Sequence, residues 1–171
     1  MSHRTGAKFS IRDYRLSDFA TLWDIDQRCF PPGISYSKLE LGGFLSRRNA
    51  VALVAELQKD EIPRGDSPAA NPDDQIAGFV VAHSIRHKYG RILTLDILPE
   101  ARRAGLGTRL MLACEERLRS LGCGAVYLET AVNNEFALRL YRKLGYEVLD
   151  VLPEYYPSHA LDAFQMGKQL R

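Results

Sequence analysis

The sequence predicts an α/β domain, of the α+β kind, built on one mixed and largely antiparallel sheet. Apolar runs of strand and helix length follow one another in the order β-α-α-β-β-β-α-β-α-β-β. One connection, from residue 92 to residue 131, joins two strands through a helix, and such a crossover requires a parallel pair. A chain of 171 residues, 46% hydrophobic and 26% charged, suits a single domain over residues 1–171 with its core at about 9–169.

The first elements are a strand and two helices. Phe9–Tyr14 alternates as a strand, and Ser17 is the expected N-cap of a helix that Pro31-Pro32-Gly33 ends. A second helix is expected over 37–47, although Gly42-Gly43 within it has low helix propensity. The residues at helical spacing in the first helix are Phe19, Leu22, Trp23, Ile25, Asp26 and Phe30.

Three strands are expected next, over 50–57, 75–86 and 92–98. Residues 59–74 contain prolines, a glycine and several acidic residues, so they are predicted to be a solvated insertion between the first two of these strands. Residues 87–90 are the expected turn before the third strand.

The last third of the chain continues with two helices and three strands. A long amphipathic helix begins near Leu106 and ends before Gly122, and a short helix begins at Asn133-Asn134 and ends at Gly145. The three strands are expected over 125–131, 146–152 and 161–167.

The turn Arg102-Arg103-Ala104-Gly105-Leu106-Gly107-Thr108 lies between a predicted strand and the long helix. A glycine turn that opens a helix exposes N–H groups without intrahelical partners, and the helix dipole adds partial positive charge there. Such a turn can hold a phosphate or a pyrophosphate. Taken alone, however, it is shared by dinucleotide folds and by plain tight turns.

Further motifs point to one particular superfamily of proteins with such a turn. Arg102-x-x-Gly105-x-Gly107 resembles the pyrophosphate loop of the GNAT superfamily of acyl-CoA N-acyltransferases. Those enzymes also carry an Asn-x-x-Ala-x-x-Leu-Tyr helix and a Lys-Leu-Gly-Tyr/Phe turn, which stand here at residues 134–141 and 143–146. A dinucleotide fold is disfavoured, because no ribose-binding acidic residue follows in the expected strand context.

Within that superfamily the chain is similar to the bacterial ribosomal-protein-alanine N-acetyltransferases, through Cys29-Phe30-Pro31, Leu128-Glu129 and Tyr155-Tyr156-Pro157. The resemblance implies a seven-stranded GNAT sheet, about four helices and a splayed parallel strand pair. It also implies acetyl-CoA (coenzyme A) as cofactor, Glu129 as general base and Tyr141 as general acid. The cofactor contacts it implies are Leu95, Asp96, Ile97, Arg102, Arg103, Ala104, Gly105, Leu106, Gly107, Thr108 and Asn134.

Acyl transfer from a thioester to an amine needs a neutral amine, a stabilised oxyanion and a proton for the leaving thiolate. Glu129 suits the first task, with a carboxylate on the open face of the sheet as the alternative. Tyr141 suits the last, with a packed core ring as the alternative. Asp96 either approaches the acceptor amine or is a surface or ion-paired carboxylate, and we favour the second interpretation.

Exposed strand N–H groups at Leu95 and Ile97 are expected to hold an extended pantetheine arm, with Ile97 polarising the thioester carbonyl. This requires the strand 92–98 to diverge from the strand 125–131. Tyr36, Tyr155 and Tyr156 are the expected acceptor contacts, because loops at these places flank the peptide groove in protein N-terminal acetyltransferases. The alternative is that these rings cover the edge of the core.

Composition limits the other function classes. A net charge of +2 with scattered basic residues argues against nucleic-acid and membrane binding. The odd set Cys29, Cys114 and Cys123 lacks metal-ligand spacing, so no metal is expected and the thiols are predicted to be reduced. No apolar run approaches membrane-spanning length and the polar start lacks a secretory segment, so a cytoplasmic monomer or homodimer is expected.

The sequence therefore predicts an acetyl-CoA-dependent N-acetyltransferase that acts by direct attack without an acyl-enzyme. Its leading acceptor is a protein or peptide N-terminal α-amine, with a ribosomal protein as one candidate. A small amine, such as a polyamine, an aminoglycoside or an amino-acid derivative, is the alternative acceptor. An acyl-CoA-binding module without catalysis is the alternative from another class.

Overall fold

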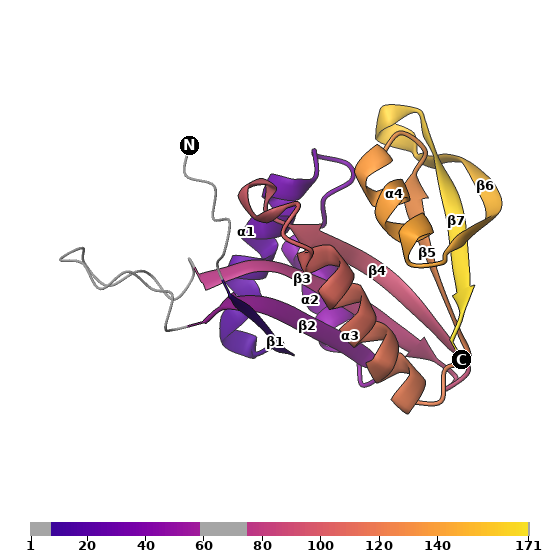
Figure 1. The fold of residues 1–171 in the computed structure, drawn as a ribbon. Coiled ribbons are helices and arrows are strands. Elements are labelled where there is room, and N and C mark those ends of the chain that lie inside the picture. The colour runs from indigo at the N-terminus through magenta and orange to yellow at the C-terminus, as the bar shows by residue number, and fades with distance from the viewer. Residues whose placement is uncertain (1–7, 59–74, 171) are drawn as a thin grey trace.

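The computed structural model describes residues 8–58 and 75–170, which form a mixed seven-stranded sheet with helices on both faces (Figure 1). The strand order is β1-β2-β3-β4-β5-β7-β6, and every neighbouring pair is antiparallel except β4 and β5. The strands are β1 Phe9–Asp13, β2 Ala50–Leu57, β3 Ile76–Ile85, β4 Tyr89–Ile97, β5 Ala125–Ala131, β6 Glu147–Tyr156 and β7 Leu161–Gln169. The predicted fold is confirmed.

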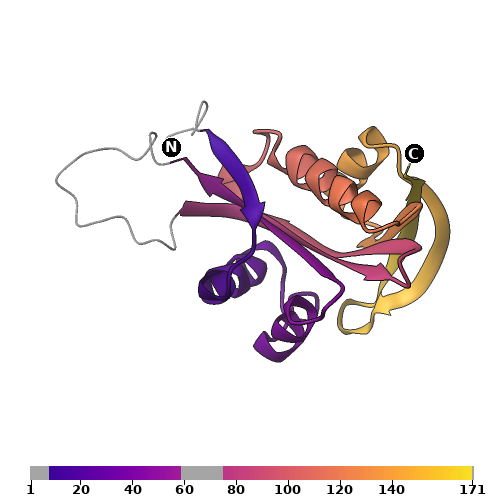
Figure 2. The same ribbon diagram turned by 90° about the horizontal axis from the view of Figure 1, so that it is seen from below.

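The helices divide between the two faces of the sheet (Figure 2). α1 (Phe19–Cys29) and α2 (Lys38–Leu45) cover one face and bury a cluster around Leu22, Leu41 and Phe79. α3 (Leu106–Ser120) and α4 (Glu135–Lys143) cover the other and bury the larger cluster. The described helices include none that is long and apolar enough to cross a membrane.

The central parallel pair is short. β4 and β5 pair only at Tyr89↔Ala125, Gly90↔Val126 and Arg91↔Tyr127. Beyond Arg91 the strands separate, and Figure 1 shows them close at one end and apart at the other. The divergence expected from the resemblance is therefore present.

Buried polar contacts hold α3 against the C-terminal half of the sheet. Glu115 of α3 is 2% exposed and accepts hydrogen bonds from the Tyr146 hydroxyl (2.9 Å) and the Lys168 ammonium (2.8 Å). A buried carboxylate needs such partners, so this cluster fixes α3 relative to β7 on the far side of the divergence.

Several predicted boundaries change. Ser17 is not the N-cap of α1, because Leu16–Asp18 form a separate 3-10 turn and Asp18 accepts the Arg15 N–H at 2.8 Å. α2 forms despite its glycines, since Ser37 and Glu40 make a reciprocal capping box. β4 begins at Tyr89, inside the predicted turn 87–90, and β6 extends to Tyr156. The insertion predicted over 59–74 lies outside the described residues.

Candidate active site

The open edge of β4 forms one side of the candidate site. The Leu98 N–H donates to Ala77 of β3 at 2.9 Å, so strand alternation turns the backbone groups of Leu95 and Ile97 away from β3, into the divergence. Side chains occupy two carbonyls of this edge. The Tyr36 hydroxyl donates to Leu93 O at 3.1 Å, and Arg102 Nε donates to Ile97 O at 3.1 Å.

The turn before α3 presents a run of free backbone donors. Among the described residues, no carbonyl or side chain accepts a hydrogen bond from any amide between Arg103 and Thr108. Arg103 (φ 67°) and Gly105 (φ 74°) both have left-handed backbone conformations, with residues 102–105 exposed. Alternation of left-handed and right-handed residues turns successive N–H groups toward a common point, which makes an anion-binding concavity.

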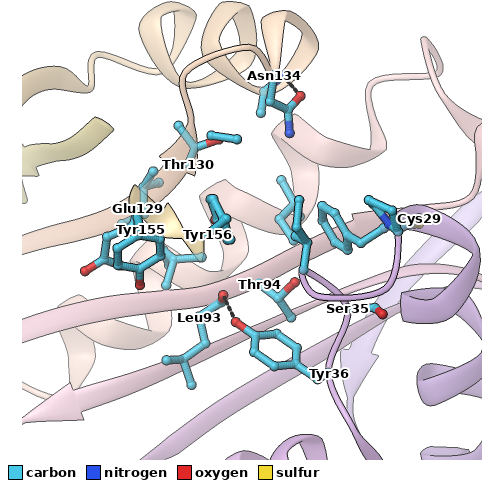
Figure 3. A pocket seen from close by; sticks show the side chains of 18 of the residues that line it. Cys29, Ser35, Tyr36, Leu93, Thr94, Glu129, Thr130, Asn134, Tyr155 and Tyr156 are labelled. Carbon is cyan, nitrogen blue, oxygen red and sulfur yellow. Dashed lines mark hydrogen bonds between the residues drawn. The ribbon is translucent and has the colours of Figure 1, made fainter. Parts of the chain in front are cut away.

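A pocket of about 730 Å³ occupies the divergence between β4 and β5 (Figure 3). Of the predicted site residues, those lining it are Tyr36, Leu95, Ile97, Arg102, Glu129, Asn134, Tyr141, Tyr155 and Tyr156. Residues 103–108 lie beyond its lining, next to Arg102 at the start of α3. The structure thus joins predicted residues from β4, β5, α4, the end of β6 and the segment between α1 and α2 in one cavity.

Glu129 lies on β5 at the wall of this pocket. Its side chain is 10% exposed, and its Oε2 accepts a hydrogen bond from Arg91 Nε at 3.3 Å. Arg91 Nη2 also donates to the Tyr155 hydroxyl at 3.4 Å. Figure 3 shows Glu129 and Tyr155 together at one side of the cavity, with Tyr36 and Asn134 at opposite ends. Glu129 is therefore a pocket carboxylate rather than one on an open sheet face.

Tyr141 lies in α4 with its ring 7% exposed, packed against Tyr146 at a centroid distance of 5.7 Å. No hydrogen bond joins its hydroxyl to another described residue. Burial is the main cause that raises the pKa of Tyr141 well above that of a free tyrosine. The phenol therefore keeps its proton at neutral pH while bordering the pocket.

The other three predicted tyrosines of the pocket, Tyr36, Tyr155 and Tyr156, come from two separate segments. Tyr36, between α1 and α2, packs edge-on against Phe44. Tyr155 and Tyr156, at the end of β6, stand edge to face with centroids 5.0 Å apart. Burial raises the pKa of Tyr156 to about 12, with smaller contributions from Tyr155 and Glu129, so this phenol is also neutral at physiological pH. The walls present aromatic surface together with hydroxyl groups.

Asp96 differs from the favoured prediction of a surface or ion-paired carboxylate. Its side chain is completely buried on the α1 side of the sheet, and it does not line the pocket. Its Oδ1 accepts a hydrogen bond from Thr94, and its partner across the α1 interface is Asp26, which is equally buried. The prediction was wrong because it considered the strand without the helix that covers it.

Sequence similarity decides the class of the site. The family model of the Acetyltransferase (GNAT) family matches residues 19–146, which is most of the chain. This chain belongs to the GNAT family.

Three relatives of this GNAT chain show the range of its similarity. An N-alpha-acetyltransferase from Sulfurisphaera tokodaii is 28% identical over 172 residues, covering 98% of the chain and 96% of the relative. A mycothiol acetyltransferase from an Arthrobacter species is 29% identical over 89% of the chain, which spans 51% of that protein. The uncharacterized protein ML0378 from Mycobacterium leprae is 34% identical over 58% of the chain, and the matched part is 28% of its length.

Solved structures share the fold at lower identity. The ribosomal-protein-S18-alanine N-acetyltransferase from Escherichia coli has a TM-score of 0.77 at 19% identity, covering 95% of this chain and 94% of the other. Arabidopsis thaliana NAA60 in complex with acetyl-CoA has a TM-score of 0.77 at 20% identity, covering 95% and 99%. At these identities the likeness establishes the GNAT architecture.

Some features of this GNAT site were not predicted from the sequence. Arg91 was missed, although an arginine between apolar strand residues was a visible signal. Asp26 was counted among the core-facing positions of its helix without a role. Asn134, predicted to contact the cofactor, uses Oδ1 to accept the Ala137 N–H at 3.2 Å and cap α4, which leaves its amide NH2 toward the pocket.

Proposed function

We propose that this GNAT acetyltransferase transfers the acetyl group of acetyl-CoA to a protein N-terminal α-amine by direct attack. The observation that carries the proposal is that one pocket brings together the free edge of β4, the Glu129 carboxylate and the Tyr141 phenol. The Sulfurisphaera tokodaii N-alpha-acetyltransferase, which matches along nearly the whole chain, supports a polypeptide N-terminus as acceptor.

The described residues fit coenzyme A. The unpartnered amides of Arg103–Thr108 suit its pyrophosphate, and the Leu95 and Ile97 N–H groups suit the amide-containing pantetheine arm. When bound there, acetyl-CoA supplies an activated acyl carbon with a thiolate leaving group. Gly107 lets α3 approach α4, since a Cβ there would lie 2.9 Å from Leu140 Cδ2.

Glu129 and Tyr141 take the two proton-transfer roles. The Glu129 carboxylate accepts a proton from the acceptor ammonium, directly or through one water; the neutral nitrogen then bonds to the acetyl carbon and releases its second proton to solvent. The Ile97 N–H stabilises negative charge on the carbonyl oxygen. As the carbon–sulfur bond breaks, the Tyr141 hydroxyl donates its proton to the sulfur, and solvent restores both groups. Cys29, Cys114 and Cys123 have no nucleophilic part, and burial is the main cause that raises the pKa of Cys29 and Cys114 to about 12.

The acceptor is placed on the Tyr36 and Tyr155–Tyr156 side of the pocket. Phenol hydroxyls there suit peptide backbone groups, and the rings suit packing on a first side chain. Arg91 supports the same wall by holding Glu129 and Tyr155 together.

Gly105→Val should weaken coenzyme A binding roughly tenfold or more, a change of about 1.4 kcal/mol per factor of ten. No protein atom lies within 4 Å of a Cβ at this position, so the added branches would obstruct the ligand, while the backbone strain of a valine at positive φ is shared by the control variant. Gly145→Val is the matched control, because Gly145 (φ 92°) is equally left-handed but follows α4. Calorimetric titration measures both affinities, and unchanged affinity in Gly105→Val would reject the pyrophosphate placement.

Glu129→Gln should lower kcat at neutral pH about 10²-fold with little change in coenzyme A affinity, the usual size for loss of a general base. The rate should partly recover as pH rises, because solvent then deprotonates the acceptor amine. Glu147→Gln, at an exposed position of β6, is the control. A rate that stays low at every pH would contradict a role limited to amine deprotonation.

Tyr141→Phe should slow transfer roughly 10²-fold or more if proton donation to sulfur limits the rate. Tyr146→Phe is the comparison: it removes the hydroxyl of the neighbouring buried ring, whose partner is Glu115 of α3, and so measures the cost of losing a buried phenol outside the proposed chemistry. Single-turnover measurement of released thiol separates the two variants. Equal rates for Tyr141→Phe and wild type would reduce Tyr141 to a packing residue.

Intact-mass analysis should detect one added acetyl group on peptides with small first residues, and none on peptides whose N-terminus is blocked. A panel containing a polyamine, an aminoglycoside and amino-acid derivatives should remain unmodified. Acetylation of the small amines alone would favour that acceptor class instead. Coenzyme A binding without any turnover would indicate a non-catalytic module.

A further inference from the structure

The feature that carries a further inference is the pair of carboxyl groups between α1 and β4. Asp26 and Asp96 are both 0% exposed and interact directly across the helix–strand interface. Asp26 Oδ1 and Asp96 Oδ2 are buried and have no hydrogen-bond partner among the described residues. Two ionised carboxylates would only repel each other there, whereas one proton held between these two oxygens would give both of them a partner.

The surrounding hydrogen bonds locate the charge and the proton. Asp26 Oδ2 accepts from the Tyr36 N–H at 2.7 Å and from Gln27 Nε2 at 3.1 Å, whereas Asp96 accepts only from Thr94. Donors stabilise the ionised form, so Asp26 holds the negative charge and Asp96 the proton. Burial, and then the charge of Asp26, raise the pKa of Asp96.

The charged and titratable groups around the pair come from every neighbouring element. Glu40 of α2 adds negative charge near Asp26, while Arg102, which follows β4, partly offsets it near Asp96. The Cys29 thiol and the Tyr36 and Tyr141 phenols, all neutral at physiological pH because burial raises their pKa values, are the other titratable groups near the pair. Among these described neighbours, Arg102 is the cation that acts on Asp96, and it is engaged with Ile97 O.

The pair connects the two walls of the pocket. On the α1 side, Asp26 holds the Tyr36 N–H, while Trp23 Nε1 and Gln27 Nε2 donate to Tyr36 O at 3.1 and 2.8 Å. On the β4 side, Asp96 lies between Leu95 and Ile97. The Tyr36 hydroxyl closes the loop by donating to Leu93 O, as the dashed line in Figure 3 shows.

We propose that Asp26 and Asp96 are positioning residues that share one proton, and that this shared proton fixes Tyr36 against β4 and so sets the acceptor side of the pocket. The role of Tyr36 in acceptor binding rests on the proposed function. The shared proton and the fixed position of Tyr36 do not rest on it. Removing the donor leaves the Asp26 carboxylate buried without its partner, and it must then take up water or a proton, which loosens its hold on the Tyr36 N–H.

The experiment compares two substitutions at one site. Asp96→Asn keeps a donor of the same shape toward Asp26, and should leave the acceptor KM near wild type. Asp96→Ala removes the donor and should raise the acceptor KM roughly tenfold or more, the size expected for stranding a buried charge, with a smaller change in coenzyme A affinity. Val81→Ala, which deletes a buried side chain from the same face of β3, controls for a cavity and should leave this KM unchanged.

Two readouts do not depend on acetyl transfer. Trp23 is the only tryptophan in the sequence and donates to Tyr36 O, so its emission should shift in Asp96→Ala but not in Asp96→Asn. The folded wild type retains a proton that the unfolded chain loses above its ordinary aspartate pKa. The pair therefore contributes a decrease in wild-type stability as pH rises above about 4, and Asp96→Asn should lack that contribution to the slope.

Equal acceptor KM values in Asp96→Ala and Asp96→Asn would overturn the positioning role. Identical pH slopes of stability in wild type and Asp96→Asn would overturn the shared proton. The wild-type enzyme could also fail to acetylate peptides while the variants show the expected Trp23 shift and pH slopes. That result would contradict the proposed acceptor but not the proton-sharing pair.

Discussion

The separation of β4 from β5 beyond Arg91 is the constraint on which the rest of the structure depends. Paired strands satisfy each other's backbone groups, so a parallel pair that stops after Arg91 leaves an open edge in the middle of the sheet. α3 follows β4 and α4 follows β5, so each strand brings a helix start to the opening. The amide turn at Gly105 and the cap residue Asn134 therefore lie at two sides of the same gap.

The backbone groups of an open strand edge within a protein need hydrogen-bond partners, and here only some of the carbonyl groups have them. Side chains from outside the strand pair occupy its carbonyls: Tyr36 at Leu93 O, and Cys29 Sγ (3.3 Å) with Arg102 at Ile97 O. The N–H groups of Leu95 and Ile97 have no such partners among the described residues. This explains why the segment between α1 and α2, far away in sequence, belongs to the site. Its side chains bind carbonyl groups of the β4 edge, while the N–H groups of the same edge stay available.

Much of this arrangement follows from local sequence patterns. Strand alternation placed Glu129 on the face opposite Leu128, and the glycine turn with its helix start was visible at Gly105. Asp96 shows where such reasoning stops, because its burial depends on α1 packing across the sheet, a contact between residues 70 positions apart. Arg91 was missed for a related reason: its partner Glu129 lies on a strand that pairs with β4 only at its first residues, and the register of that pairing is a tertiary property.

The most direct test of the account is a titration of the protein with coenzyme A, followed by the chemical shift of each backbone amide. The account predicts the largest changes at Arg103–Thr108, Leu95 and Ile97, with much smaller changes on the outer strands β1 and β6. Changes centred elsewhere, or no binding at all, would contradict the placement of the cofactor between the diverging strands and with it the proposed chemistry.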